Sequence, residues 1–98
     1  MPETAWREDL DELLRAVANP HRRRILELVW PEPHSAGELS DALGLAPAST
    51  SEHLKVLRKT GLVKLTVSGT FRIYHADPAR IGRLVALLGR AFPLEEEP

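Results

Sequence analysis

The chain has 98 residues, 43% of them hydrophobic and 28% charged, which is the balance of one ordinary globular domain over 1–98 and not of a disordered or fibrous protein. The absence of cysteine excludes disulfides, thiolate metal sites and cysteine nucleophiles. No apolar run approaches the ~20 residues of a membrane span or forms a signal core, so we expect a cytoplasmic protein with no membrane contact. The net charge of −1, taken alone, argues against a nucleic-acid binder.

Helical periodicity and capping signals predict three helices in the first half of the chain. Residues 4–18 carry apolar side chains on one helical stripe. The Asn-Pro pair at 19–20 favours a second helix to about residue 30, because asparagine caps a helix and proline suits its first position. Ser35 and Glu38 form a capping-box motif that starts a short third helix, which Gly44 ends.

A fourth helix follows the third after a very short turn. It is predicted over 47–60, starts at a proline and is closed by Gly61. Thr50, Leu54 and Leu57 are expected to face inward. Two helices joined by so tight a turn predict a helix-turn-helix over 35–60.

One β-hairpin is predicted over 62–75, where β-branched and aromatic residues flank a turn at Gly69. Asp77 and the proline after it start a last helix over 78–92, and 93–98 form an acidic tail. The fold class is therefore mostly α with a small β-hairpin, in the order α-α-α-α-β-β-α.

The small net charge hides a segregated pattern. Residues 54–90 hold eight Lys or Arg against one acid, which is net +7. Residues 15–31 are net +3, whereas 1–14, 32–53 and 91–98 are net −4, −4 and −3. Such asymmetry says more about partners than the total charge does.

The element order and three stretches of sequence resemble the ArsR/SmtB-type family of bacterial dimeric transcriptional regulators. The stretches are LLRAVANPHRRRILELV (13–29), SAGELSDALGLAPASTSEHLKVLRKTGLVKL (35–65) and VSGTFRIYHAD (67–77). The resemblance covers roughly three-quarters of the chain, and it implies a winged helix-turn-helix fold. It also implies that the helices over 4–18 and 78–92 pair two subunits.

The resemblance places the helix over 47–60 in the DNA major groove and the hairpin over 62–75 as the wing. A major groove is about 12 Å wide and accepts one helix, whose early residues meet base edges. The implied partner is a palindromic operator in double-stranded DNA. The recognition helices of the two protein subunits are then expected about one turn of DNA, ~34 Å, apart. The residues expected at DNA are Ala48, Ser49, Ser51, Glu52, His53 and Lys55 near the bases, and Arg58, Lys59, Lys64 and Arg72 at phosphates.

A homodimer has independent support in the two end helices. A chain of this length cannot cover every face of five helices, and leftover apolar surface usually means a partner. The alternative is that both apolar stripes simply close the core of one chain. The residues expected at the dimer interface are Trp6, Leu10, Leu14, Leu84, Leu88 and Phe92.

The metal sites usual in this family have no counterpart here, so we expect no metal and no cofactor. Members that sense thiophilic metals carry cysteine on the third helix, but here 38–41 read Glu-Leu-Ser-Asp. Other members use histidines and carboxylates on the last helix, but 78–92 contain none. A metal sensor with an unusual site stays an alternative, although a tetrahedral site needs about four ligands. The donors for such a site are His34, His53, His75 and Asp77.

Other departures from the family weaken the expected DNA contact. Glu52 stands where many relatives have Arg or Gln; a carboxylate accepts from a cytosine amino group but repels phosphate. It is otherwise a solvated acid or pairs with Lys55. Ala46 lacks a capping side chain, and the wing tip lacks a base. The alternative function is therefore a protein-interaction module that needs a partner regulator or a small ligand to bind DNA.

The three arginines at 22–24 have two interpretations. They either touch phosphate or form a solvated face, with one of them pairing with Glu27 or Asp11. The sequence shows no P-loop or dinucleotide motif. Ser49, Ser51 and His53 do not face one another at these spacings, so we expect no catalytic residues and no enzyme.

Overall fold

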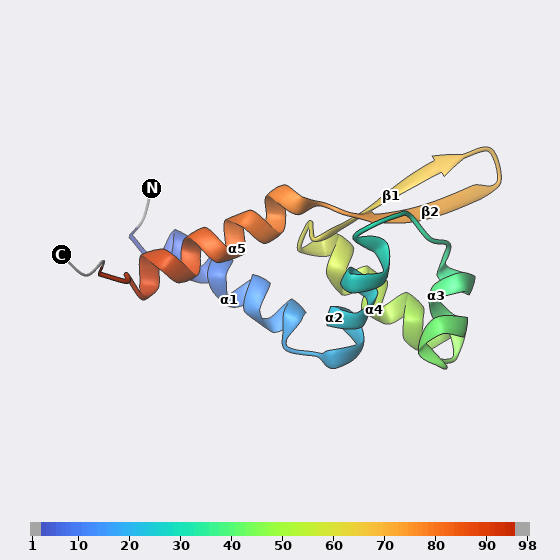
Figure 1. Ribbon diagram of the computed structural model, residues 1–98, viewed down its shortest axis with the longest axis horizontal. Coiled ribbons are helices and arrows are strands. Elements are labelled where there is room, and N and C mark those ends of the chain that lie inside the picture. The colour runs from blue at the N-terminus through green and yellow to red at the C-terminus, as the bar shows by residue number, and fades with distance from the viewer. Residues whose placement is uncertain (1–2, 96–98) are drawn as a thin grey trace.

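The computed structural model describes residues 3–95, so the predicted acidic tail is described only as far as residue 95. The expected order of elements is confirmed, with bounds shifted by one or two residues (Figure 1). The elements are α1 (Ala5–Val17), α2 (Pro20–Val29), α3 (Ala36–Leu43), α4 (Pro47–Lys59), β1 (Val63–Ser68), β2 (Phe71–Ala76) and α5 (Pro78–Ala91).

The predicted caps explain where three of these helices begin. The Asn19 side chain accepts hydrogen bonds from the backbone N–H groups of the first turn of α2. Ser35 and Glu38 form the reciprocal capping box, at 3.1 and 2.9 Å. Asp77 accepts from the Ala79 N–H at the start of α5. Ala46 provides no side-chain cap for α4, as its sequence predicted.

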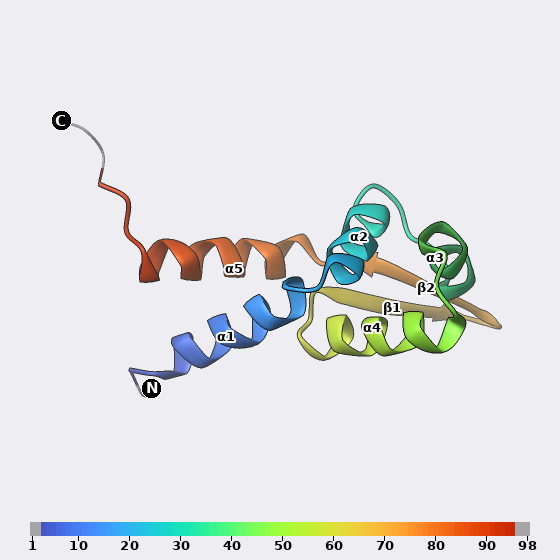
Figure 2. The same ribbon diagram turned by 90° about the horizontal axis from the view of Figure 1, so that it is seen from below.

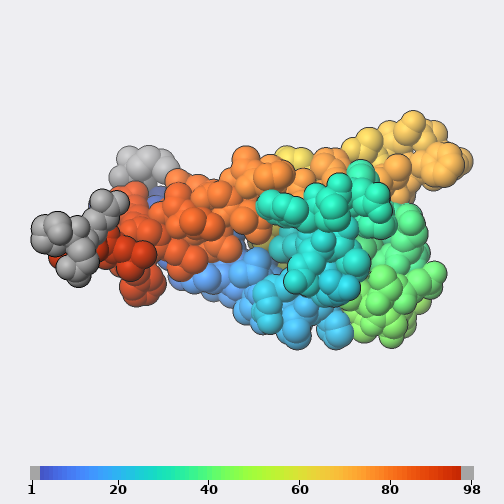
Figure 3. All heavy atoms as spheres, viewed as in Figure 1, coloured from blue at the N-terminus to red at the C-terminus, as the bar shows by residue number. Residues whose placement is uncertain are grey.

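The molecule has two parts, a helical arm and a more compact head. In Figures 1 and 2, α1 and α5 lie side by side and extend away from the remaining elements. We call α1 and α5 the arm, and α2, α3, α4 and the hairpin the head. Figure 3 shows the resulting elongated outline, and the extents of the molecule are 52 × 31 × 22 Å.

The hairpin is antiparallel, and β1 runs beside α4 (Figure 2). Its strands begin one residue later than predicted. The Leu62 N–H bonds the Leu57 carbonyl and so still closes α4, which leaves Val63 as the first strand residue. Gly69 has φ +61° in the turn, the conformation for which glycine was expected there.

The hydrophobic core joins the arm to the head, and it includes three residues that were expected at a dimer interface. Trp6, Leu10 and Leu84 are buried within the single chain, where α1 packs on α5. For these three, burial within one chain favours the alternative that the stripes close the core of that chain. Leu14 and Phe92 are exposed, and Leu88 is half-buried. Within residues 3–95, no helix combines the length and apolarity that crossing a membrane requires.

Candidate nucleic-acid interface

The helix-turn-helix holds α4 by its apolar and hydroxyl face. Gly44 takes the left-handed conformation, φ +66°, that turns the chain from α3 into α4. The Ser40 hydroxyl donates to the Thr50 hydroxyl at 2.8 Å, and both side chains are buried. Leu54 and Leu57 complete the buried face of α4. The opposite face is left to solvent, as a helix that reads a DNA groove requires.

Five of the six residues expected near DNA bases lie on this exposed face. His53 differs, because its ring is half-buried against the start of α2. Glu52 forms no salt bridge with Lys55 or with any other residue of the described part, 3–95. Its carboxylate is therefore exposed to solvent in the second turn of α4. The five exposed residues are Ala48, Ser49, Ser51, Glu52 and Lys55.

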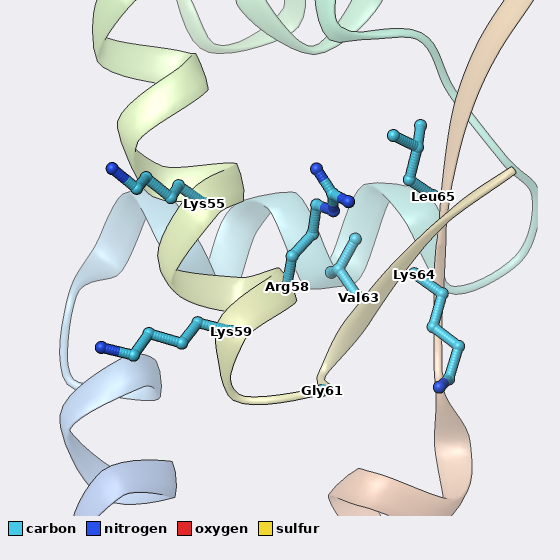
Figure 4. A pocket seen from close by; sticks show the side chains of 7 residues that line it. All are labelled: Lys55, Arg58, Lys59, Gly61, Val63, Lys64 and Leu65. Carbon is cyan, nitrogen blue, oxygen red and sulfur yellow. The ribbon is translucent and has the colours of Figure 1, made fainter. Parts of the chain in front are cut away.

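Four predicted DNA-binding cations gather around one open hollow between α4 and β1. The hollow has a volume of about 520 Å³. Figure 4 shows Lys55 and Lys59 pointing to the same side of α4, with Arg58 between the helix and β1. Lys64 lines the hollow from β1, but Figure 4 shows its side chain pointing away from the other three cations, and its ammonium lies 3.7 Å from the Asp77 carboxylate. Like charges gathered in a concave surface focus a positive potential, which attracts phosphate.

Arg72 lies apart from this cationic hollow. It lines a second hollow, of about 540 Å³, between the hairpin and the start of α3. Phe71 beside it is 70% exposed, so the wing presents an apolar side chain next to its one arginine. The structure therefore places Lys64 beside α4, whereas Arg72 lies apart on the hairpin.

His53 is held in its neutral form by its surroundings. Its ring centroid lies 5.6 Å from that of His21, and its Nδ1 lies 3.4 Å from the Arg22 guanidinium. Burial lowers the pKa of His53 below its ordinary value, and the charges of Arg22 and His21 lower it further. At neutral pH the imidazole therefore meets Arg22 as a hydrogen-bond acceptor.

Acidification is expected to destabilise the fold through His53. Because the folded state lowers this pKa, the unfolded chain binds the proton more readily, and stability present above about pH 6.5 is lost as the pH falls toward the folded-state pKa. The thermal midpoint should drop between about pH 7.5 and 5.5. The variant His53→Gln should drop less, since glutamine still accepts from Arg22 but does not titrate. Equal drops for both proteins would contradict the assignment.

Two arginines that sequence reasoning placed in solvent or on phosphate instead cap α1. The Arg22 guanidinium donates to the carbonyls of Ala16, at 2.6 Å, and Arg15, at 2.9 Å. Arg23 donates to the Val17 carbonyl at 2.7 Å. These carbonyls belong to the last turn of α1, where helix acceptors lack the usual backbone partners and a cation is favourable. The tight Asn-Pro turn was a signal for this contact, because it brings the start of α2 back to the end of α1.

The third arginine of the run behaves as predicted. Arg24 pairs with Glu27 at 3.5 Å across one helical turn, and both side chains are exposed. Such a pair contributes little to stability. Arg24 is also not among the residues that line the cationic hollow.

A cluster that the sequence did not reveal joins α1, α5 and the end of α4. Asp9 accepts from both Arg80 and Arg83 of α5. The hydrogen bond from Arg80 holds the pKa of Asp9 below its ordinary value. The same Arg80 donates to the carbonyl of Thr60, the C-cap of α4, at 2.8 Å. Asp9 and Arg80 stand 71 positions apart, so no local pattern could indicate the pair.

Three of the four donors considered for an unusual metal site, His34, His53 and Asp77, have other partners. Across residues 3–95, no three His, Asp or Glu side chains gather closely enough to hold a metal ion. Asp77 caps α5 and pairs with Lys64, whereas His34 lies within 4 Å of Glu32 and Glu38. A metal site would have to recruit these residues from their present partners.

Comparisons with known proteins agree with this geometry. Residues 17–66 match the family described as a helix-turn-helix domain. The chain is 35% identical over 89 residues to the HTH-type transcriptional regulator Rv2034 of Mycobacterium tuberculosis, covering 91% of this chain and 76% of that protein.

Two solved structures share the fold. An ArsR-like transcriptional regulator from Rhodococcus sp. RHA1 superposes with a TM-score of 0.79 at 25% identity, covering 86% of this chain and 79% of that one. The homodimeric winged helix-turn-helix DNA-binding domain Mb0332 from Mycobacterium bovis gives a TM-score of 0.74 at 24% identity, covering 100% and 94%. The predicted winged helix-turn-helix fold is thereby confirmed.

Proposed function

Because this chain belongs to the helix-turn-helix transcriptional regulators of the ArsR/SmtB type, we propose that it acts as a homodimer that binds a palindromic operator in double-stranded DNA. The observation that carries the proposal is the cationic hollow of Lys55, Arg58, Lys59 and Lys64 beside the exposed face of α4. The start of α4 meets base edges in the major groove, and the hollow binds the flanking phosphates.

An apolar face on α5 supports the homodimer. Val85 is 63% exposed on a side of α5 turned away from Leu84 and Leu87, which pack in the core, and Phe92, directly after α5, is 69% exposed. Gly82 and Gly89 share this side, and nothing lies within 4 Å of the position of a Cβ on either. Small residues between two apolar ones let a second helix approach closely.

This face continues from the arm onto the head. Ile81, at the near end of α5, lines an apolar hollow of about 390 Å³ together with Leu26, Trp30 and Pro31. Trp30 is half exposed there. Exposed apolar surface of such continuity marks a protein contact. A second copy of the chain is the occupant that places two α4 helices on one DNA duplex, as a palindrome requires.

The direct test uses the purified full chain and the DNA duplex immediately upstream of its own gene. If a dimer binds with four cations from each protomer, eight phosphates are neutralised and log Kd changes with log salt concentration with a slope of about 7. Fluorescence anisotropy over a salt series measures this slope. Affinity independent of salt would contradict the proposal.

The same experiment distinguishes the proposed function from the alternative, a protein-interaction module. Glu52, an exposed acid in the second turn of α4, and the exposed apolar Phe71 on the wing are the features that favour a protein-interaction module. No binding by the pure protein, followed by binding after a co-purifying regulator is added back, would identify that function instead.

A further inference from the structure

One side chain, Arg80, bridges three helices. It belongs to the first turn of α5, and its forked guanidinium donates to both carboxylate oxygens of Asp9 on α1. Its Nε donates to the Thr60 carbonyl at the end of α4, at 2.8 Å. The alkyl part of Arg80 lies over Gly61, about 3.5 Å from where a Cβ would stand. A cation at a helix C-terminus is favourable, so α4 gains from this contact as well.

A second arginine, Arg22, connects the arm to α4 at a point about two turns of α4 before Thr60. Arg22 holds the last carbonyls of α1, and the same guanidinium lies 3.4 Å from Nδ1 of His53 on α4. His53 and Thr60 are seven residues apart, which is about 10 Å along a helix axis. Two ties at this separation fix both the position and the tilt of α4 relative to α1.

The arm and the head otherwise meet over a narrow junction. Figures 1 and 3 show α1 and α5 extending to one side of the head, and α1 packs chiefly on α5 and α2 rather than on α4. The recognition helix and the proposed dimer face therefore lie on different parts of the molecule. Their relative orientation depends on what crosses the junction, which is the shared hydrophobic core, the Arg22 bonds to α1 and one bond from Arg80 to Thr60. Asp9 holds the same Arg80 guanidinium from the arm side and so orients it toward Thr60.

We propose that Arg80 is a positioning residue that fixes the angle between the arm and the head and thereby sets the half-site spacing that the dimer accepts in DNA. Arg22 is the second tie. This inference rests on the proposed function, because only a dimer on a palindrome has a half-site spacing. Inserting one base pair moves a half-site by about 3.4 Å and turns it by roughly 36°, so a stiff junction rejects it and a loose one tolerates it.

The DNA experiment compares wild type with Arg80→Lys. Lysine keeps the charge and the stem over Gly61, but its ammonium cannot serve Asp9 and Thr60 with a fixed fork. The matched control is Arg83→Lys, which alters a half-exposed contact to the same carboxylate. The wild type first selects its site from a randomised duplex library. All proteins are then titrated against this site and against versions with one base pair added or removed at the centre.

Wild type and Arg83→Lys are expected to lose about tenfold or more in affinity for the altered spacings, whereas Arg80→Lys should lose about threefold or less. An Arg80→Lys profile as steep as that of the wild type overturns the inference and leaves the proposed function standing. If the wild type selects no DNA, the proposed function is overturned. The role of Arg80 in holding the arm against the head is then tested without DNA, by the distance measurement that follows.

A measurement without DNA tests directly how rigidly the junction holds the arm against the head. The chain has no cysteine, so Asp11→Cys on α1 and Asp41→Cys on α3, both exposed positions, accept one spin label each without further changes. Labelled protein is diluted in unlabelled protein, and pulsed electron resonance gives the distance distribution within one chain. Arg80→Lys should broaden it and Arg83→Lys should not. Equal widths overturn the inference. If Arg80→Lys does not fold, Asp9→Asn takes its place with the same expected broadening, because it removes the carboxylate that orients the Arg80 guanidinium toward Thr60.

Discussion

Val85→Glu is expected to give a folded monomer that binds operator DNA at least about a hundredfold more weakly than the wild type. Val85 is 63% exposed on the face of α5 that turns away from α1, so a carboxylate there leaves the single chain intact. In the proposed dimer the same carboxylate would be buried against apolar side chains without a partner, which costs several kcal/mol. A monomer also loses the gain from binding two half-sites at once.

Sedimentation equilibrium gives the mass of the Val85→Glu protein, and fluorescence anisotropy gives its affinity for DNA. Val85→Thr is the matched control, because it keeps the shape without the charge and should remain a dimer at the same concentration. A Val85→Glu protein that still sediments as a dimer would place the interface on another surface.

Arg58→Ala is expected to weaken DNA binding about tenfold or more at moderate salt and to make the salt slope shallower by about 2. Arg58 is exposed at the centre of the cationic hollow, between α4 and β1. Removing it takes one phosphate contact from each protomer of the dimer. The loss should be similar for operator and unrelated duplexes, because phosphate contacts carry no sequence information.

Lys55→Ala should also weaken binding, but with a larger loss on the operator than on unrelated DNA. Lys55 lies on the exposed face of α4 nearer the residues that meet bases. Arg24→Ala is the control for both variants, since Arg24 is an exposed arginine already paired with Glu27 outside the hollow. Equal losses for Arg24→Ala and Arg58→Ala would show that the hollow has no special role.

The local signals in the sequence were sufficient for the helices and the turns. Caps such as Asn19 and Ser35 bond to groups within three residues of their own position, so both partners belong to one short sequence motif. The strand starts were less certain, because Leu62 suits either the end of α4 or the start of β1. Its backbone bond to Leu57 decides this, and such a bond exists only after the helix has formed.

The contacts between residues distant in the sequence could not be predicted in the same way. Arg80 and Asp9 meet because α5 folds back along α1, and their partnership depends on tertiary structure rather than on spacing. The apolar stripe of α1 was visible, but its partner was not: Trp6 and Leu10 pack on α5 of the same chain. Periodicity identifies which face is apolar and leaves open what covers it.

Hydroxyl-radical footprinting of the purified wild-type chain on the DNA that it selects tests the central claim most directly. The account predicts two protected backbone patches related by two-fold symmetry and centred about one helical turn, ~34 Å, apart, with a stoichiometry of two chains per duplex. A single asymmetric patch protected by one chain would contradict it.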